Sequence, residues 1–207
     1  MYLPPHFEVT DRAAVQAVVA ACPLATWATV ADGAPVVNHV PFWLDPTQGE
    51  HGTLIGHVAR ANPVWKHPAP SVVAFHGPDG YVSPSWYPSK HEHGKVVPTW
   101  NYAVVHAHGM PQVVDDAAEL HALVSRLTDV HEGRQALPWK VADAPPDYVA
   151  QLLRAIVGIR IPVQRWVGKF KLSQNQPAPN RLGVLTGLQQ REGTGALVAL
   201  MQQQAPQ

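Results

Sequence analysis

The stretch "PLATWATVADGAPVVNHVPFWL", residues 23–44, decides the fold class of this chain. β-Branched and aromatic residues dominate on both sides of Asp32-Gly33. An Asp-Gly pair between two such runs is typical of the tight turn that joins antiparallel strands. The stretch therefore predicts a β-hairpin and an antiparallel sheet.

Further strand and helix patterns follow along the chain. The 21 prolines and 15 glycines are spread out, which favours many short strands over long helices. Strands are expected at 52–58, at 101–114 with a kink at Gly109, at 158–173, and in a second hairpin, 71–77 and 81–87, that turns at Pro78-Asp79-Gly80. Helices are expected at 10–22 with Thr10 as N-cap, 115–130, 146–155 and 191–203; a helical turn interrupted by Pro63 and polar loops at 84–99 and 174–181 lie between. Six or seven strands with a few helices predict a mostly β, α+β fold: a small antiparallel barrel with helices packed on it.

Composition and charge bound the function classes. The chain has 207 residues, of which 46% are hydrophobic and 14% charged, so it can bury a sizeable core. No apolar run approaches about 18 residues, and "MYLPPHFEVTD" at the N-terminus lacks the features of a signal peptide. We therefore expect a cytoplasmic protein without a membrane span.

Charge is distributed unevenly along the chain. Residues 1–147 hold 8 basic and 14 acidic residues, a net charge of −6. Residues 148–207 hold 7 basic and 1 acidic residue, a net charge of +6. A basic C-terminal third can serve an anionic ligand, a nucleic acid or an acidic surface of a partner subunit, and the sequence alone leaves these open.

Common catalytic and metal-binding motifs are absent. The sequence contains no G-x-G-x-x-G, P-loop, HExxH, paired CxxC or G-x-S-x-G motif. His91 and His93, and likewise His106 and His108, would share a face of an extended strand. Because no third ligand stands at a suitable spacing, we expect no metal site.

Two tryptophans have neighbours that suit a ligand. Trp86 lies in "SPSWYPSK" and Trp100 in "PTWNY", whereas the other five tryptophans are expected to pack in the core. Hydroxyls, an amide and a lysine beside aromatic faces suit a planar ligand with a hydrogen-bonding edge. On residue types alone, ordinary packing and a ligand wall both remain open.

Two basic segments are candidates for an anionic group. In "GHVARANP", residues 56–63, Arg60 follows a strand at the start of a helical turn and can grip a phosphate, although it can equally be an ordinary surface arginine. In "GKFKLSQNQ", residues 168–176, Lys169 and Lys171 share one face of a strand.

These blocks together resemble a known family, the FMN-binding negative transcriptional regulators, or PaiB-like proteins. The blocks are "MYLPPHFEVTD", "GHVARANPVWK", "YVSPSWYPSK", "VVPTWNYAVVHAHG" and "GKFKLSQNQP". They occur in this order over nearly the full chain, which is far more specific than any one of them. The resemblance implies a split β-barrel of the FMN-binding, flavin-reductase-like type. The barrel domain would span residues 1–172 with an inserted helical segment near 115–155, followed by a C-terminal loop and helical extension, 173–207.

The resemblance also implies a homodimer with FMN at the subunit interface. Three residues would lie near the phosphate and ribityl chain: His57, Arg60 and Asn62. The facing wall would comprise Ser83, Ser85, Trp86, Tyr87 and Lys90. The flavin pocket would be lined by Thr99, Trp100, Asn101 and Tyr102, and Lys169 and Lys171 would reach in from either subunit.

The function expected from this resemblance is that of an FMN-binding homodimer, a negative transcriptional regulator. Direct DNA binding has no recognisable motif to support it, since neither a helix-turn-helix nor a sustained basic stripe is present. One alternative is a flavin-dependent oxidoreductase or reductase of unidentified substrate, in which FMN carries the redox chemistry. Another is a non-catalytic barrel that binds haem or a different ligand.

Overall fold

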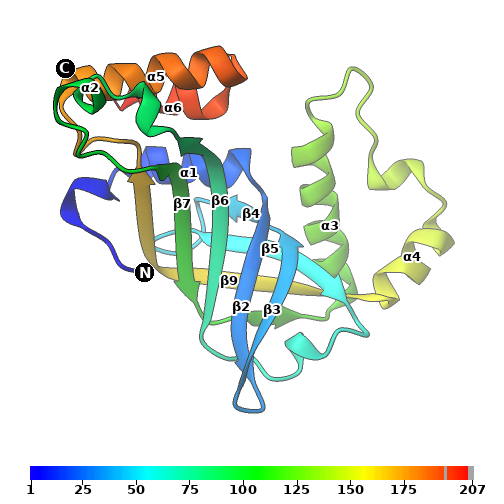
Figure 1. Cartoon of the computed structure of the whole chain (residues 1–207). Coiled ribbons are helices and arrows are strands. Elements are labelled where there is room, and N and C mark those ends of the chain that lie inside the picture. Colours follow the sequence, from blue (N-terminus) through cyan, green and yellow to red (C-terminus); the bar gives the residue numbers. More distant parts are fainter. Residues whose placement is uncertain (194, 205–207) are drawn as a thin grey trace. The chain divides into compact units, whose positions relative to one another are not determined.

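Strands in the computed structural model form one nine-stranded sheet, and every pairing described below is antiparallel (Figure 1). The structure describes residues 1–193 and 195–204. The strands are β1 (Glu8–Val9), β2 (Leu24–Ala31), β3 (Ala34–Pro41), β4 (Trp43–Asp45), β5 (Thr53–Ala59), β6 (Ser71–Val82), β7 (Thr99–Gly109), β8 (Gln112–Val114) and β9 (Ile156–Lys171). The α-helices are α1 (Arg12–Ala21), α2 (Ser89–His93), α3 (Ala117–Glu132), α4 (Pro146–Arg154), α5 (Ala178–Glu192) and α6 (Ala196–Gln203). Short 3-10 helices are η1 (Pro5–Phe7), η2 (Pro63–Trp65), η3 (Pro84–Trp86) and η4 (Val141–Asp143). The predicted mixture of antiparallel strands and helices is confirmed.

Hydrogen bonds connect the main strands in the order β3-β2-β6-β7-β9-β5-β4, and β1 and β8 also pair with β9. The chain divides into two compact units, which are treated separately below. The first unit comprises Met1–Val18, His76–Val105 and the chain from Val167 onward. The second unit comprises Val19–Phe75 and His106–Trp166. Every helix in the described residues is too short or too polar to span a lipid bilayer.

The hairpin predicted from residues 23–44 is present in the second unit. β2 and β3 pair along their whole length up to Ala31 and Ala34. Asp32 and Gly33 form the turn with positive φ values of 51° and 76°, the backbone that a two-residue turn of this kind requires. β3 ends at Pro41, and Trp43 begins the separate strand β4, which pairs with β5.

The second unit curls on itself, because two strands far apart in the hydrogen-bonded order meet. β3 is the first strand in the hydrogen-bonded order and β5 is the sixth, yet the two contact each other. α3 packs on this unit through a core cluster of Ile55, Val114, Leu123 and Leu127. A curled sheet with a helix over one face places side chains from β3, β5 and α3 around a common space.

The second predicted hairpin is wrong, because residues 71–82 form the single strand β6. Gly80 was expected in the turn, but Gly77 and Gly80 both permit close packing within the strand instead. A Cβ at Gly77 would lie 3.0 Å from the Cβ of Ala103, and one at Gly80 would lie 2.8 Å from Leu197 Cδ2. Within the first unit, β6 can therefore approach both its neighbouring strand and α6.

The boundaries of several helices also differ from prediction. Asp11, not Thr10, caps α1, since its side chain accepts a hydrogen bond from the Ala13 amide at 3.0 Å. Pro63 begins η2 rather than interrupting a turn, and Asn62 caps it. The loop expected at 84–99 contains η3 and α2, and the strand expected at 101–114 ends at Gly109 before β8.

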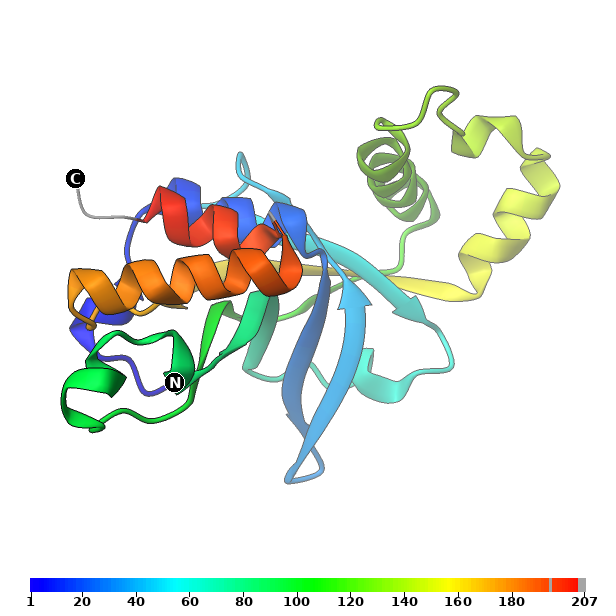
Figure 2. The same ribbon diagram turned by 45° about the horizontal axis from the view of Figure 1, so that its top comes forward.

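The C-terminal region holds two helices where one was expected. α5 begins at Ala178, directly after Pro177, inside a segment predicted to be a loop. α6 then follows, and the two helices contact each other side by side (Figure 2). α5 contains Gly183 and Gly187, and their packing role is described below.

Candidate functional site

The predicted cofactor residues fall into two groups. Eleven lie in the first unit: Ser83, Ser85, Trp86, Tyr87, Lys90, Thr99, Trp100, Asn101, Tyr102, Lys169 and Lys171. Three lie in the second unit: His57, Arg60 and Asn62. Each group is considered within its own unit.

A pocket of about 240 Å³ in the first unit, here called the lysine pocket, collects three of the eleven. They are Tyr87, Thr99 and Lys171. The pocket is completed by Lys95, Val96, Val97, Ser173, Asn175 and Gln176. These six were missed, although the polar run "SQNQ" after Lys171 was a signal for three of them. The pocket draws on residues from both sides of position 172, and the domain boundary expected there stays a prediction.

The lysine pocket is suited to an anionic group. Lys171 Nζ donates to the hydroxyl oxygen of Thr99 and to the carbonyl oxygen of Trp100, each at 2.6 Å. An ammonium group has three N–H donors, so one is left for a ligand. The residues that line the pocket, all within the described chain, include two lysines and no carboxylate. Burial, together with the nearby charge of Lys169, lowers the pKa of Lys171 below its usual 10.5.

The turn after Lys171 is held in a strained conformation. Ser173 has a φ of 64°, a left-handed backbone that a residue other than glycine rarely adopts. Its hydroxyl donates to Asn101 Oδ1 at 3.1 Å, and the Asn101 amide nitrogen lies 3.5 Å from Met201 Sδ. The Gln174 side chain accepts from the Leu172 amide at 2.6 Å. Strain that a surrounding network maintains is common at binding sites.

Asn101 therefore supports the lysine pocket through its contact with Ser173 and is not among the residues that line it. It is fully buried, with no exposed surface, while Trp100 next to it is 54% exposed. The alternation expected for an extended strand is observed here. The Trp100 ring meets Tyr81 edge to face at 6.1 Å, which places an exposed aromatic pair on β6 and β7. The role of Asn101 as a direct ligand contact stays a prediction.

Tyr102 and Lys169 belong to a second cluster in the first unit. Lys169 is almost completely buried and donates to the Tyr2 carbonyl oxygen at 3.0 Å. Its Nζ lies 5.5 Å from the centre of the Tyr102 ring and 5.6 Å from that of Tyr2. Lys169 thus fixes the N-terminal segment, while Lys171 serves the lysine pocket.

The "SPSWYPSK" block is ordered by internal contacts and by α5. Ser83 accepts from the Ser85 amide at 3.2 Å, and Lys90 Nζ donates to the Ser85 hydroxyl at 3.1 Å. The Trp86 ring lies against Gly187, where a Cβ would come within 2.3 Å of the indole. The Arg191 guanidinium lies 5.5 Å from the centre of the same ring. Trp86 accordingly packs against α5 in the space that Gly187 leaves, here called the glycine notch.

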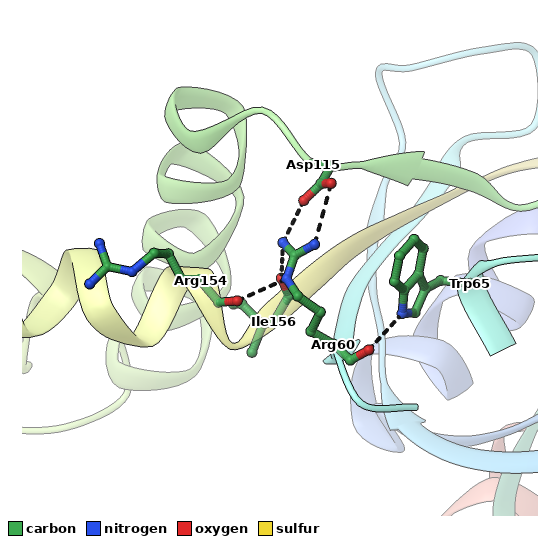
Figure 3. A network of polar contacts seen from close by, with 5 residues as sticks. All are labelled: Arg60, Trp65, Asp115, Arg154 and Ile156. Carbon is green, nitrogen blue, oxygen red and sulfur yellow. Dashed lines mark hydrogen bonds and ion pairs between the residues drawn. The ribbon is translucent and has the colours of Figure 1, made fainter. Parts of the chain in front are cut away.

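Arg60 in the second unit is held by its own chain (Figure 3). Its Nε donates to the Arg154 carbonyl oxygen at 2.8 Å and its Nη2 donates to the Ile156 carbonyl oxygen at 2.9 Å. Both terminal nitrogens also bond the Asp115 carboxylate, and this contact lowers the pKa of Asp115. A phosphate would have to compete with Asp115 for the guanidinium, so the predicted phosphate role of Arg60 stays untested.

Replacing Arg60 with alanine is expected to lower the melting temperature and to weaken FMN and riboflavin equally. The change leaves Asp115 and two carbonyl groups without their donor. Because the pKa of Asp115 is lowered in the folded state, the ion pair stabilises above the unfolded value of about 3.9. The part of the destabilisation that comes from the missing ion pair therefore disappears as the pH falls through the lowered pKa of Asp115.

Arg154→Ala is the matched control, since its exposed guanidinium makes no contact recorded among the described residues and only its carbonyl oxygen is used. Thermal unfolding and ligand titration measure both variants. A loss confined to FMN in Arg60→Ala would support the predicted phosphate role of Arg60.

His57 lies in a second, larger pocket of about 360 Å³. The pocket is lined by Pro41, His57, Val124, Leu127, Thr128, His131, Glu132 and Trp139. His57 Nδ1 is buried and has no hydrogen-bond partner among the described residues, and burial lowers the pKa of the imidazole.

Two other residues of the second unit were singled out in the sequence. The Asn62 side-chain amide donates to Asn38 Oδ1 at 2.7 Å. Trp139, expected in the core, is instead 47% exposed.

Comparison with known proteins identifies relatives over most of the chain. Residues 1–165 match the model of the family described as "Putative FMN-binding domain". The chain is 30% identical over 201 residues to protease synthase and sporulation protein PAI 2 of Bacillus subtilis, covering 95% of this chain and 93% of that protein.

Solved structures with the same fold bind flavins according to their names. The flavocytochrome Anf3 from Azotobacter vinelandii superposes with a TM-score of 0.59 at 19% identity, covering 79% of this chain and 69% of that one. An FAD and heme binding protein from Mycobacterium smegmatis gives 0.54 at 20% identity, covering 84% and 78%. The split β-barrel predicted from the sequence is confirmed.

Proposed function

The chain belongs to the family of FMN-binding domains whose model it matches over residues 1–165, and on this basis we propose that it is a homodimeric flavoprotein of the regulatory, PaiB-like type. The cofactor that this family assigns is FMN. The observation that carries the proposal is the lysine pocket, whose lining residues, except Lys95, lie within the blocks that resemble the family, and which offers donors without carboxylates.

The lysine pocket fits the polar part of FMN. Lys171 and Lys95 would hold the phosphate, because cations and N–H donors without a carboxylate favour an oxyanion. Ser173, Asn175 and Gln176 would serve the hydroxyl groups of the ribityl chain. When bound, FMN supplies electron-transfer or hydride-transfer chemistry, and the protein positions it.

A second copy of the chain would complete the site. Val97 at the pocket is 72% exposed and Trp100 nearby is 54% exposed. Exposed apolar side chains beside a polar pocket suit a subunit interface over the flavin ring. The homodimer is the assembly expected from the family resemblance, and the roles of His57 and Asn62 as cofactor contacts stay predictions.

The regulatory role rests on the resemblance to the PaiB-like proteins and on the match to PAI 2. The alternative of a flavin-dependent oxidoreductase uses the same site and the same cofactor. DNA binding and turnover of an electron donor are therefore measured separately, once the cofactor has been identified.

Purified protein is expected to show flavin absorbance near ~450 nm and to sediment as a dimer of 22.5 kDa chains. Chromatography of the ligand released on denaturation should identify FMN at one molecule per chain. Protein that remains monomeric at micromolar concentration with flavin bound would contradict the interface but not the cofactor.

A second candidate function is haem binding at His57. The observation that favours it is the buried Nδ1 of His57 without a hydrogen-bond partner among the described residues, on an imidazole whose pKa burial lowers, since a metal ligand must offer a free nitrogen. Two structures with this fold are named as a flavocytochrome and as an FAD and heme binding protein. The absorbance spectrum of the purified protein also tests this candidate, because bound haem gives a Soret band that His57→Ala should abolish.

A further inference from the structure

A third pocket, of about 430 Å³, lies in the second unit outside every block that resembles the flavin-binding family. We call it the arginine pocket. Its lining consists of Trp43, Asp45, Pro46, Thr47, Gln48, Ile55, Ala122, Leu123, Arg126 and Arg160. These residues come from β4, the loop to β5, β5 itself, α3 and β9, all within one unit.

Arg126 presents an unpaired guanidinium to this pocket. The group lies over the Trp43 ring, 4.8 Å from its centre. Within residues 1–193 and 195–204 it makes no hydrogen bond or ion pair, although its charge acts on Asp45 in the same lining. A guanidinium stacked on an aromatic face keeps its N–H edge available, and that edge matches the two oxygens of a carboxylate or phosphate.

Arg160 supplies a second set of donors. Its backbone is fixed in the ladder opposite Ile55. One terminal nitrogen donates to Glu119 Oε2 at 3.0 Å. Its Nε is buried and has no partner among the described residues. A buried N–H without an acceptor is unfavourable, and a ligand oxygen would satisfy it.

Asp45 is the single carboxylate in the lining, and its oxygens are already used. It accepts from the Thr47 amide at 3.0 Å, from the Thr47 hydroxyl at 2.7 Å and from the Gln48 side chain at 2.7 Å. These bonds, with the nearby charge of Arg126, lower the pKa of Asp45. Asp45 therefore orders the loop that walls the pocket, and the groups left unsatisfied are donors.

We propose that the arginine pocket binds the oxyanion of a small molecule, a phosphate or a carboxylate, between Arg160 and the Arg126 guanidinium stacked on Trp43. The Trp43 ring, Ile55 and Leu123 provide an apolar wall for the remainder of that ligand. Such a site would give the protein an effector input separate from its flavin.

Isothermal titration of the full-length protein at low salt tests the proposal, with inorganic phosphate and succinate as separate probes. We expect saturable binding of at least one anion, weakened roughly tenfold or more by Arg126→Gln, since charge-assisted bonds to a guanidinium are lost. The tighter of the two anions identifies the ligand class. Arg134→Gln, which changes an exposed arginine outside the pocket, should bind as the parent does.

Stability and flavin content are measured on the same samples. Arg126 lies on the exposed side of α3, so Arg126→Gln should keep the parent's melting temperature. Absence of saturable binding by either anion, or equal binding by parent and Arg126→Gln, overturns the proposal. Loss of FMN binding in Arg126→Gln also overturns it, because the pocket would then hold the flavin phosphate. Anion binding is measured whether or not the protein carries flavin. A protein that binds the anion but no FMN would therefore contradict the cofactor assignment and leave the anion site standing.

Discussion

Replacing Gly187 with alanine is expected to destabilise the protein by about 2 kcal/mol, although alanine is the better helix former. The new Cβ would lie 2.3–2.5 Å from three atoms of the Trp86 indole. Neither side can yield easily, since Gly187 is inside α5 and the Trp86 ring is also faced by Arg191. Overpacking typically costs about 1–3 kcal/mol and occasionally more, and the gain in helix propensity offsets at most about 1 kcal/mol.

Gly183→Ala should have a larger effect at the same contact. There the Cβ would lie 1.9 Å from the Trp86 carbonyl oxygen, a backbone atom. η3 would have to move away from α5, and the "SPSWYPSK" block would then lose the helix that supports it.

Thermal unfolding measures both glycine variants against Thr186→Ala, an exposed position on the same helix. For a chain of this size about 2 kcal/mol corresponds to a fall of roughly 4–8 °C. If Gly187→Ala has the same melting temperature as Thr186→Ala, then Trp86 does not occupy the glycine notch. In that case the indole would be available for the flavin wall in which Trp86 is predicted to lie.

Lys171→Met is expected to weaken FMN binding roughly ten- to a hundredfold and to leave riboflavin almost unaffected. Methionine keeps much of the length of the side chain but removes the charge and the N–H donor that the two internal hydrogen bonds leave for a ligand. A charge-assisted hydrogen bond to a phosphate contributes about 1.5–3 kcal/mol, and riboflavin has no phosphate. Titration of ligand-free protein with each flavin measures the two affinities.

The pH dependence gives this variant a second signature. Because burial and Lys169 lower the pKa of Lys171, its charge is lost at a pH below the usual 10.5. FMN affinity of the parent should fall as the pH rises through that lowered pKa, and Lys171→Met should lack this step. Lys66→Met, an exposed lysine beside Trp65 in the other unit, is the control. Equal losses of FMN and riboflavin in Lys171→Met would place the phosphate elsewhere.

The sequence predicted the elements whose signals are local. The hairpin at 23–44, β5, α3, α4 and β9 follow from apolar periodicity and turn residues within a few positions. β6 was misread because Pro-Asp-Gly is a turn signal on its own. In the structure, packing of Leu197 from α6 explains why position 80 is a glycine. Information from a residue over a hundred positions away is not contained in the local pattern.

The candidate site shows the same limit. Family blocks brought Tyr87, Thr99 and Lys171 to attention, and the structure joins these three in the lysine pocket. No sequence pattern indicated that Ser173 adopts a left-handed backbone held by Asn101. That contact joins residues 72 positions apart, so the supporting network emerges only once the chain is folded.

Titration of ligand-free parent protein with FMN and with riboflavin tests the central claim most directly. The account predicts one FMN bound per chain, with an affinity roughly ten- to a hundredfold above that of riboflavin, because the lysine pocket adds a charge-assisted contact to the phosphate. Equal affinities for FMN and riboflavin, or no binding of either flavin by folded protein, would contradict it.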